Sequence, residues 1–446
     1  MSDAILASHG ILPEGTPVTS VKTHELLEKG RAAKATAHRL AFLSTEIKNR
    51  ALEGIARGLL ERKDAVLAAN ARDMEAGRAE GLSDALLDRL LLNEGRLAAM
   101  AADVRAVADL PDPVGEVFDM RTLPNGLIVG KRRVPLGVIG TIYESRPNVT
   151  VDIAVLCLKS GNAVLLRGGK EAHHSNHALA TLVKERAEAA GMPADAVQFI
   201  ESTDRAAVDQ MLKLRDCIDL LVPRGGSQLI EYVRDHATMP VVAGGIGVCH
   251  TYVDRAAKLD DAVRIVYNAK VQRPTVCNAL DTILVHREVA AVFLPAVSTE
   301  LARAGVELHC DEPSLTILKR SAGGGAGARL RPAAPEDWGK EFLALIAAVK
   351  VVDSLDQALE HIERYGSGHS EAIVTEDYSA AMRFLAEVDA AAVFVNASTR
   401  FTDGSQFGLG AEVGISTQKM HARGPLGLRE MTSYKWIIMG NGQVRP

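Results

Sequence analysis

The stretch from residue 137 to residue 243 constrains the fold most, because short apolar runs alternate there with longer amphipathic ones. The apolar runs predict strands at residues 138–143, 163–167, 197–200, 218–222 and 240–242. The runs between them predict helices at 149–158, 171–190, 205–214 and 228–236. Wholly apolar strands are covered on both faces, and this alternation is typical of βαβ units around a parallel sheet. We therefore predict an α/β unit here.

A second unit of the same kind is predicted between residues 250 and 398. Its strands are expected at 251–254, 282–286, 346–352, 372–375 and 392–396, and its helices at 259–268, 287–304 and 378–388. Upstream, residues 24–108 carry apolar stripes at helical spacing and predict helices. The glycine-rich run at 321–327 favours a flexible linker, and residues 1–20 are interpreted as an extension. A chain of 446 residues is too long for one core, so two large domains and a small appendage are expected.

Composition excludes several function classes. The net charge of −5 provides no basic field for nucleic acid, and no apolar run approaches the ~20 residues that cross a membrane. The five cysteines form no CxxC pair, so no metal site is expected. Their odd number, with no secretory apolar region after Met1, favours a reduced, cytoplasmic protein.

Residues 121–129 predict a hairpin between the helical region and the first α/β unit. Asn125 and Gly126 stand between two extended runs, which is the signal of a type I′ turn, and residues 131–134 continue as a strand. Such a hairpin is a candidate oligomerisation arm. An ordinary surface hairpin is the alternative.

Two predicted strands of the first unit end in glycine-rich turns. Arg167-Gly168-Gly169-Lys170 follows the second strand, and Arg224-Gly225-Gly226-Ser227 follows the fourth and opens a helix. Glycines let backbone N–H groups approach an anion, and ligands bind at the carboxyl ends of parallel strands. Both turns are therefore candidate phosphate sites, although each motif is weak alone. No complete GxGxxG is present, because Gly245-Ile246-Gly247 lacks the third glycine.

The loop at residues 271–282 contains one cysteine, Cys277, directly before an apolar run. Pro274 stiffens the approach to it. A cysteine becomes a nucleophile when a cationic neighbour or a helix N-terminus lowers the thiol pKa. A buried structural cysteine is the alternative interpretation.

Four motifs together resemble a known family. They are residues 143–148 (Tyr-Glu-Ser-Arg-Pro-Asn), 167–171 (Arg-Gly-Gly-Lys-Glu), 272–278 (Gln-Arg-Pro-Thr-Val-Cys-Asn) and 421–425 (His-Ala-Arg-Gly-Pro). In this order they are similar to the γ-glutamyl phosphate reductase family of the aldehyde dehydrogenase superfamily, from about residue 25 to the C-terminus. The resemblance implies a cofactor domain (1–118 and 137–247), a catalytic domain (248–410) and an oligomerisation arm with a C-terminal segment (119–136 and 411–446).

The resemblance implies a phosphorylating glutamate-5-semialdehyde dehydrogenase. Such an enzyme reduces L-glutamyl 5-phosphate with NADPH, in the second step of proline biosynthesis, as a homo-oligomer (dimer or tetramer). Glutamate 5-kinase is a candidate for functional coupling. Cys277 matches the nucleophile that forms a thioester. Glu341 matches the acid that holds the nicotinamide ribose, and Arg167 and Lys170 occupy the place where relatives meet the adenosine ribose. The other residues of the two turns are also expected to bind the cofactor: Gly168, Gly169, Arg224, Gly225, Gly226 and Ser227.

The remaining site residues are candidates. The oxyanion donors are expected among the Cys277 backbone N–H and the side-chain amides of Asn278 and Asn148. The cations for the leaving phosphate are expected among Arg146, Arg400, His421 and Arg423, although each arginine has a structural ion pair as its alternative.

One departure from the wider superfamily is informative. Hydrolytic members carry a glutamate base in the stretch that corresponds to residues 240–245, Pro-Val-Val-Ala-Gly-Gly, which here lacks a carboxylate. A thioester on Cys277 should therefore resist water. The alternatives are an NAD(P)-dependent semialdehyde dehydrogenase that forms a free acid, and a non-enzymatic member of the fold.

Overall fold

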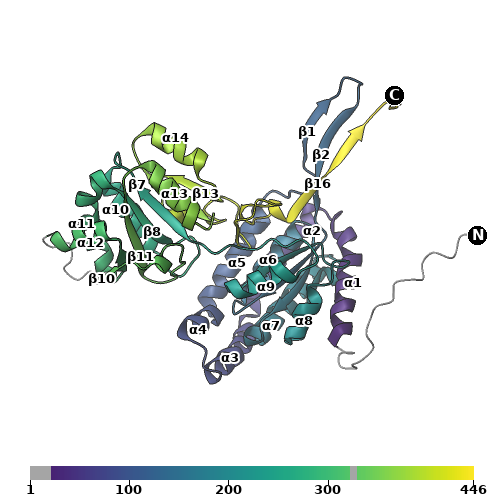
Figure 1. The fold of residues 1–446 in the computed structure, drawn as a ribbon. Coiled ribbons are helices and arrows are strands. Elements are labelled where there is room, and N and C mark those ends of the chain that lie inside the picture. The colour runs from purple at the N-terminus through teal and green to yellow at the C-terminus, as the bar shows by residue number, and fades with distance from the viewer. Residues whose placement is uncertain (1–21, 322–328, 446) are drawn as a thin grey trace, which may run out of the picture.

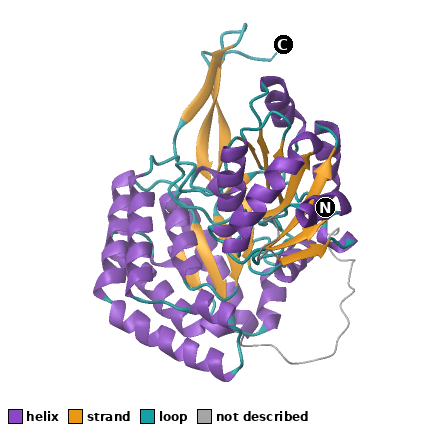
Figure 2. Ribbon diagram, turned by 90° about the vertical axis from the view of Figure 1, so that its left-hand side faces the viewer, coloured by secondary structure: helices purple, strands orange, loops and turns teal. Residues whose placement is uncertain are grey.

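The computed structural model describes residues 22–321 and 329–445. The predicted N-terminal extension and all but the first residue of the predicted linker lie outside the described residues. Figure 1 shows two α/β bodies and a narrow β-sheet arm that extends from them. Figure 2 shows that helices cover the strands of both bodies, whereas the arm projects beyond the helices. None of the described helices is long and apolar enough to cross a bilayer.

The N-terminal region is helical, as its apolar stripes predict. The helices are α1 (Lys22–Leu40), α2 (Thr45–Glu61), α3 (Lys63–Ala79), α4 (Asp84–Leu90) and α5 (Glu94–Asp109). Ser44, Ser83 and Asn93 precede α2, α4 and α5, and each side chain accepts a hydrogen bond from a backbone N–H of the first turn. The apolar stripe of α2 is fully buried, so this region shares one core with the first sheet.

The first sheet has four parallel strands in the order β5-β4-β3-β6. Its strands are β3 (Val138–Tyr143), β4 (Ala163–Gly168), β5 (Val197–Phe199) and β6 (Leu220–Arg224), and its helices are α6 (Asn148–Lys159), α7 (His173–Ala189), α8 (Arg205–Met211) and α9 (Ser227–His236). The predicted strand at 240–242 is wrong as a full strand, because only Val241 forms a bridge, to Leu221. Pro240 has no N–H to donate, and the glycines that follow carry the chain away.

The second sheet has seven parallel strands in the order β10-β9-β11-β8-β7-β12-β13. The strands are β7 (Cys249–Val253), β8 (Leu280–His286), β9 (Glu307–Cys310), β10 (Arg329–Pro332), β11 (Ile346–Val352), β12 (Ser370–Val374) and β13 (Ala392–Val395). The helices are α10 (Leu259–Val271), α11 (Arg287–Arg303), α12 (Glu312–Arg320), α13 (Leu355–Tyr365) and α14 (Tyr378–Glu387). The predicted α/β class with two parallel sheets is confirmed. The short polar strands β9 and β10 were not predicted.

The arm is an antiparallel sheet of three strands in the order β1-β2-β16. β1 (Val117–Thr122) and β2 (Ile128–Pro135) form the predicted hairpin, and β16 (Thr432–Met439) adds a strand from the far end of the chain. The predicted type I′ turn is wrong, because Asn125 has no positive φ and only Gly126 (φ +86°) does. The Gly126 N–H closes the turn on the Leu123 carbonyl (2.9 Å), and Pro124 fixes a negative φ between them.

Short elements complete the chain. They are β14 (Ile415–Ser416), β15 (Gly424–Pro425) and the 3₁₀ turns η1 (Lys170–Ala172), η2 (Ala194–Ala196), η3 (Pro335–Asp337), η4 (Thr399–Phe401) and η5 (Arg429–Met431). β14 and β15 pair in an antiparallel sheet, and a bridge between Gly244 and Ser416 ties them to the connection between the two bodies.

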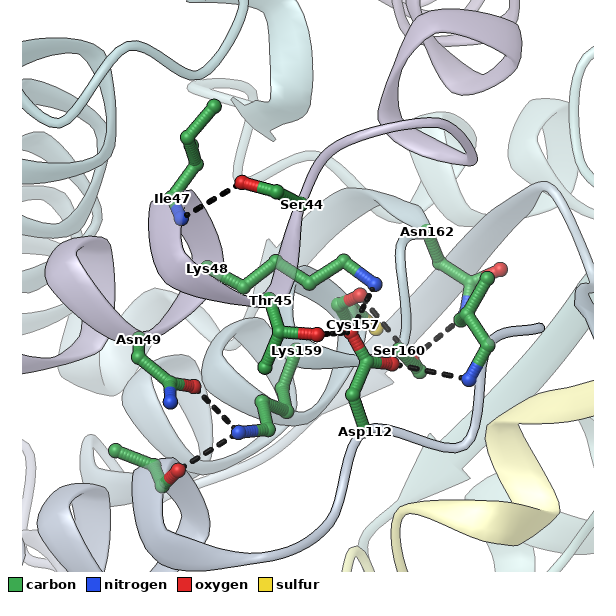
Figure 3. Close-up of polar contacts among 12 residues, drawn as sticks. Ser44, Thr45, Ile47, Lys48, Asn49, Asp112, Cys157, Lys159, Ser160 and Asn162 are labelled. Carbon is green, nitrogen blue, oxygen red and sulfur yellow. Dashed lines mark hydrogen bonds and ion pairs between the residues drawn. The ribbon is translucent and has the colours of Figure 1, made fainter. Parts of the chain in front are cut away.

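Two buried lysines hold the chain segment after α5 in place (Figure 3). Lys48 on α2 donates to the Asp112 carboxylate (2.8 Å), which also accepts from the Thr45 hydroxyl (2.9 Å). Lys159 at the end of α6 donates to the Asn49 side chain and to the Ala108 carbonyl (2.7 Å). Because a buried ammonium is costly without partners, these contacts fix where α2, α5 and α6 meet.

Candidate functional site

Cys277 lies in the loop between α10 and β8, at the amino end of β8. Its side chain is half-buried, whereas the other four cysteines are buried. Gly247, in the connection between the bodies, and Cys249, the first residue of β7, fix its backbone. The Cys249 thiol donates to the Cys277 carbonyl (3.3 Å), and a Cβ on Gly247 would stand 1.6 Å from that carbonyl oxygen. Position 247 therefore accepts only glycine while the loop keeps this shape.

The thiol of Cys277 is surrounded by charges of both signs. Burial raises its pKa to about 11, the Arg224 guanidinium opposes this rise, and the Glu341 and Glu412 carboxylates add to it. The backbone N–H of Cys277 itself also favours the thiolate. The expected lowering of the thiol pKa is therefore absent in the free protein. A bound group or a base must help to remove the proton.

Four arginines share the electrostatic surroundings of Cys277. Arg146 and Arg224 follow β3 and β6 of the first sheet, and Arg273 and Arg400 come from the second body. The Cys277 thiolate is among the charges that act on Arg146 and Arg400, and Arg273 acts on both of these. The structure thus brings together two of the four predicted phosphate ligands, Arg146 and Arg400. It adds Arg224, which was predicted as a cofactor ligand, and Arg273, which was not predicted.

The other two predicted phosphate ligands lie in the tail that packs between the bodies. Arg423 donates to the Asp389 carboxylate (2.6 Å), and Lys419 shares this carboxylate. His421 Nε2 lies 2.7 Å from the Glu430 carbonyl oxygen. These contacts occupy both side chains, and no contact between either of them and Cys277 is found among the described residues.

The two predicted oxyanion amides already have partners. The Asn278 Nδ2 donates to the carbonyls of Thr402 (2.8 Å) and Arg400 (3.4 Å), and so holds the η4 turn against the cysteine loop. Asn148, the first residue of α6, donates through Nδ2 to Asp152 (2.8 Å). This leaves the Cys277 backbone N–H as the donor nearest to the nucleophile.

Glu341 reaches the same centre from the segment after η3. Its Oε1 accepts from the Gly247 N–H (3.0 Å), and burial raises its pKa. The next residue, Phe342, donates its N–H to Asp281 (3.1 Å) on β8. Asp281 also forms a buried ion pair with Lys270 (3.6 Å), so one rigid network holds Glu341 and the Cys277 loop together.

The turn after β4 contains the predicted cofactor cations. The Arg167 guanidinium donates to the carbonyls of Thr203 (2.9 Å) and Asp204 (3.1 Å). Lys170 forms an exposed ion pair with Glu80 (3.0 Å). Arg167 is thus tied to the protein, whereas the Lys170 pair is open to exchange with a ligand.

The turn after β6 binds an acidic oxygen of the protein itself. The Gly226 N–H at the start of α9 donates to the Glu144 carboxylate (3.0 Å), which also lies against Gly225. A backbone N–H that holds a carboxylate oxygen can equally hold a phosphate oxygen. The geometry of Gly225, Gly226 and Ser227 therefore fits the diphosphate of a nucleotide once Glu144 moves.

Two further acids were missed. Burial raises the pKa of Asp152 to about 7, with Asp103 adding to the rise. Burial and Asp403 raise the pKa of Glu412 to about 7. Arg224 acts on both acids, so they border the arginine side of the site. Among the described residues, no group of three or more His, Cys, Asp or Glu side chains could hold a metal ion.

Two α/β bodies with a cysteine loop at their junction define the class of protein. A model of the aldehyde dehydrogenase family matches residues 16–315 and 337–437. The chain belongs to this family. An acetylating aldehyde dehydrogenase of Geobacillus thermoglucosidasius has the same fold at 17% identity, with a TM-score of 0.67 over 95% of this chain and 98% of its own.

More similar relatives carry one particular name. The chain is 63% identical over 421 residues to the γ-glutamyl phosphate reductase of Dehalococcoides mccartyi strain CBDB1, covering 94% of this chain and 98% of the relative. The crystal structure of γ-glutamyl phosphate reductase from Thermotoga maritima superimposes with a TM-score of 0.90 at 48% identity, covering 95% of this chain and 100% of that one. The predicted resemblance is confirmed.

Proposed function

We propose that this protein reduces L-glutamyl 5-phosphate to L-glutamate 5-semialdehyde and releases phosphate, as the second step of proline biosynthesis from glutamate. The observation that carries the proposal is the placement of Cys277 among four arginines, two from each body. An acyl phosphate offers an electrophilic carbon to the thiolate and an anionic leaving group to the cations. The named relatives at 63% and 48% identity support the same reaction.

Cys277 acts as the nucleophile. Its thiolate attacks C5 of the acyl phosphate, the bond from C5 to the phosphate oxygen breaks, and a thioester remains on the sulfur. When bound, a nicotinamide cofactor would supply the hydride that reduces the thioester, and the aldehyde would form as Cys277 leaves as the thiolate. The Cys277 N–H is placed to stabilise the oxyanion of each tetrahedral stage, with Asn148 and Asn278 as secondary donors if their present partners release them.

NADPH is the proposed cofactor, and the chain offers it three contacts. Gly225, Gly226 and Ser227 would hold the diphosphate at the start of α9. Glu341, fixed by Gly247 beside Cys277, would hold the nicotinamide ribose and so orient the ring toward the thioester. Gly168, Gly169 and Lys170, with Arg167 behind them, would meet the adenosine ribose and its 2′-phosphate.

Arg146 and Arg400 are the proposed ligands of the substrate. His421 and Arg423 would act from the tail, where their contacts hold residues 421–430 in place. We place the enzyme in the cytoplasm. A functional coupling to glutamate 5-kinase remains a proposal that follows from the lability of an acyl phosphate in water.

A homo-oligomer, dimer or tetramer, is proposed through the arm. Large apolar side chains are exposed along its strands: Val117, Met120, Ile128, Tyr434, Trp436, Ile438 and Met439. An exposed apolar sheet of this kind favours burial against a second copy. Light scattering of Trp436→Glu/Ile438→Glu tests this, since a mass that stays at the wild-type oligomer would exclude the arm as the contact.

The requirement for phosphate distinguishes this function from an acid-forming dehydrogenase. Residues 240–245 carry no carboxylate, and Val242 and Ala243 are buried there. General-base assistance is worth roughly two to four decades in rate, so water should attack the thioester slowly. With glutamate-5-semialdehyde and NADP⁺, NADPH should form only when phosphate or arsenate is supplied. Stoichiometric glutamate without phosphate would establish the acid-forming alternative instead.

A further inference from the structure

Arg224 is the last residue of β6, and the protein holds its side chain in place. The neighbouring strand β3 pairs with β6 in a register that sets Tyr143 opposite Arg224, and the Glu144 N–H donates to the Arg224 carbonyl (3.0 Å). On the other side, a Cβ on Gly414 (φ +145°) would stand 2.8 Å from a guanidinium nitrogen of Arg224. The glycine-rich tail thus lies against this guanidinium with no room for a side chain.

Arg224 and Arg146 lack a close ionised partner among the described residues. The two acids on which Arg224 acts, Asp152 and Glu412, both have their pKa raised to about 7. Neither guanidinium has a carboxylate within ion-pair distance among the described residues. The groups acting on Arg146 are the cations of Arg224, Arg89 and Arg273, and Cys277 acts on it with the opposite sign. Burial and these cations lower the Arg146 pKa to about 10. Gathering like charges in a half-buried place is unfavourable unless a multiply charged anion binds between them.

The turn after Arg224 does not need its side chain to bind a cofactor phosphate. The N–H of Gly226 already holds a carboxylate oxygen, as shown by its contact with Glu144. The Arg224 guanidinium acts instead on the Cys277 thiolate, and it is the strongest of the groups that favour this thiolate. The side chain and the backbone of the same turn thus face different ligands.

We propose that Arg224, together with Arg146, binds the phosphoryl group of the acyl phosphate at Cys277, so that Arg224 belongs to the substrate site rather than to the cofactor site. This inference rests on the proposed function and assigns one residue to one group of that substrate. In the forward direction the two guanidinium groups receive the phosphate as the bond from C5 to oxygen breaks and the bond from C5 to sulfur forms. In reverse, they hold free phosphate while one of its oxygens attacks the thioester carbon and the thiolate leaves.

Phosphate titration in the reverse direction tests this assignment. With saturating glutamate-5-semialdehyde and NADP⁺, the rate of NADPH formation is measured against phosphate for wild type, Arg224→Gln and Arg224→Lys. A charge-assisted pair is worth about one to two decades of affinity, so Arg224→Gln should raise the KM for phosphate about 10- to 100-fold. Arg224→Lys keeps the charge but loses the planar fork, so its KM should fall between the two. The KM for NADP⁺ should stay within about twofold of wild type.

Arg234→Gln is the matched control. Arg234 lies on the same helix, α9, where it is exposed and paired with Asp235 (2.9 Å), so its loss should change neither constant. A second measurement needs no cofactor and no turnover. Phosphate should slow the alkylation of Cys277 by iodoacetamide in the wild type and in Arg234→Gln, but not in Arg224→Gln.

The outcomes separate this inference from the proposed function. A raised KM for NADP⁺ with an unchanged KM for phosphate would return Arg224 to the cofactor site and overturn the inference. Retained phosphate protection of Cys277 in Arg224→Gln would overturn it too. If wild type itself makes NADPH without phosphate, the proposed function fails before any variant is compared. Should Arg224→Gln not fold by circular dichroism, the Lys variant and its alkylation rate still decide.

Discussion

Two groups of buried or half-buried cations in this molecule are built in opposite ways. Lys48 and Lys159 each meet acceptors supplied by the chain, a carboxylate for one and an amide and a carbonyl for the other. Arg146 is surrounded chiefly by other cations, and neither Arg146 nor Arg224 forms an ion pair among the described residues, with the Cys277 thiol near both. The first group is complete without a ligand, and the second is not. The difference indicates which buried charges hold the fold together and which wait for a substrate.

The energetic consequence differs as well. Removing one partner from a complete buried pair leaves an uncompensated charge, which is costly to the fold. Removing a cation from an incomplete group relieves repulsion and desolvation, so the cost falls on binding rather than on stability. Each prediction below breaks or sharpens this contrast, and the largest expected effect comes first.

Replacing Cys277, whose sulfur reacts, should give the largest loss of activity with no loss of stability. Cys277→Ala should lose activity by about three decades or more, because covalent catalysis through one sulfur leaves no substitute. Its unfolding midpoint in urea should equal that of the wild type, since the half-buried thiol makes no structural hydrogen bond among the described residues. Steady-state rates and urea unfolding check both statements.

The remaining cysteines are the controls for this variant. Cys157, Cys217, Cys249 and Cys310, replaced singly by Ala or Ser, should each leave a working enzyme. A rate for Cys277→Ala above about a tenth of wild type would contradict the thioester route.

Breaking the buried ion pair of Lys48 and Asp112 should lower stability and leave activity unchanged. Asp112→Asn removes the carboxylate from Lys48, whose side chain is 0% exposed, so the free energy of unfolding should fall by about 3–5 kcal/mol. The activity of the folded fraction should not change. Lys48→Met/Asp112→Leu should recover much of the loss, because apolar groups of similar size replace a buried pair well. Urea titrations with an activity assay on the folded protein measure all three.

Arg146→Gln is the mirror image of that variant. Its activity should fall, whereas its unfolding free energy should equal or exceed that of the wild type. A stability loss in Arg146→Gln as large as that in Asp112→Asn would remove the distinction between the two groups.

The sequence predicted the first sheet well because its strands have a simple signature. β3, β4 and β6 are short apolar runs between helical ones, and burial on both faces requires such composition. β9 and β10 were not predicted, because polar residues such as Glu307 and Arg331 alternate with apolar ones at the edge of the second sheet. β16 was not predicted, because its pairing partner, β2, lies about 300 residues earlier, as in the pair Thr432–Pro135.

The site was predictable only in part, for a similar reason. Cys277 and Arg146 stand in motifs that resemble a family, and the motif shows the residue type directly. That the Arg224 guanidinium acts on Cys277, whereas the Asn278 amide binds the η4 turn, depends on how two bodies meet. Adjacent parallel strands end at the same edge, so Arg146 and Arg224 could have been paired once β3 and β6 were known to be neighbours.

An acid beside Arg224 should make stability depend on pH. Asp152 has its pKa raised to about 7 by burial, from an ordinary 3.8. Between these two values the folded protein keeps a proton that the unfolded chain has lost, so stability falls as pH rises and the full penalty is present above 7. The side chain introduced by Asp152→Asn does not titrate in this pH range. The free energy of unfolding of this variant should exceed that of the wild type by up to about 4 kcal/mol at pH 8 and by little at pH 4.

Urea unfolding of both proteins at the two pH values measures this difference. Asp103 and Arg224 are present in both proteins, so their own titration cancels, whereas their interaction with the Asp152 charge is part of the expected difference. A gain that is equal at pH 4 and pH 8 would show that Asp152 is not the titrating group.

The smallest effect is expected at the turn after β4, the proposed site of the adenosine ribose. One of its two cations is held by the protein, and the other has only an exposed partner. Arg167 donates to two backbone carbonyls, whereas Lys170 has only the exposed pair with Glu80. A 2′-phosphate can therefore recruit Lys170 at the loss of one surface ion pair, which is worth at most about 1 kcal/mol. Lys170→Ala should raise the KM for NADPH about tenfold and leave that for NADH unchanged.

Arg167→Ala should instead lower the unfolding midpoint and weaken the binding of both cofactors alike, because it releases the turn at residues 203–204. Kinetics with the two cofactors, together with urea unfolding, distinguish the roles, and equal losses for NADPH and NADH in Lys170→Ala would place the 2′-phosphate elsewhere.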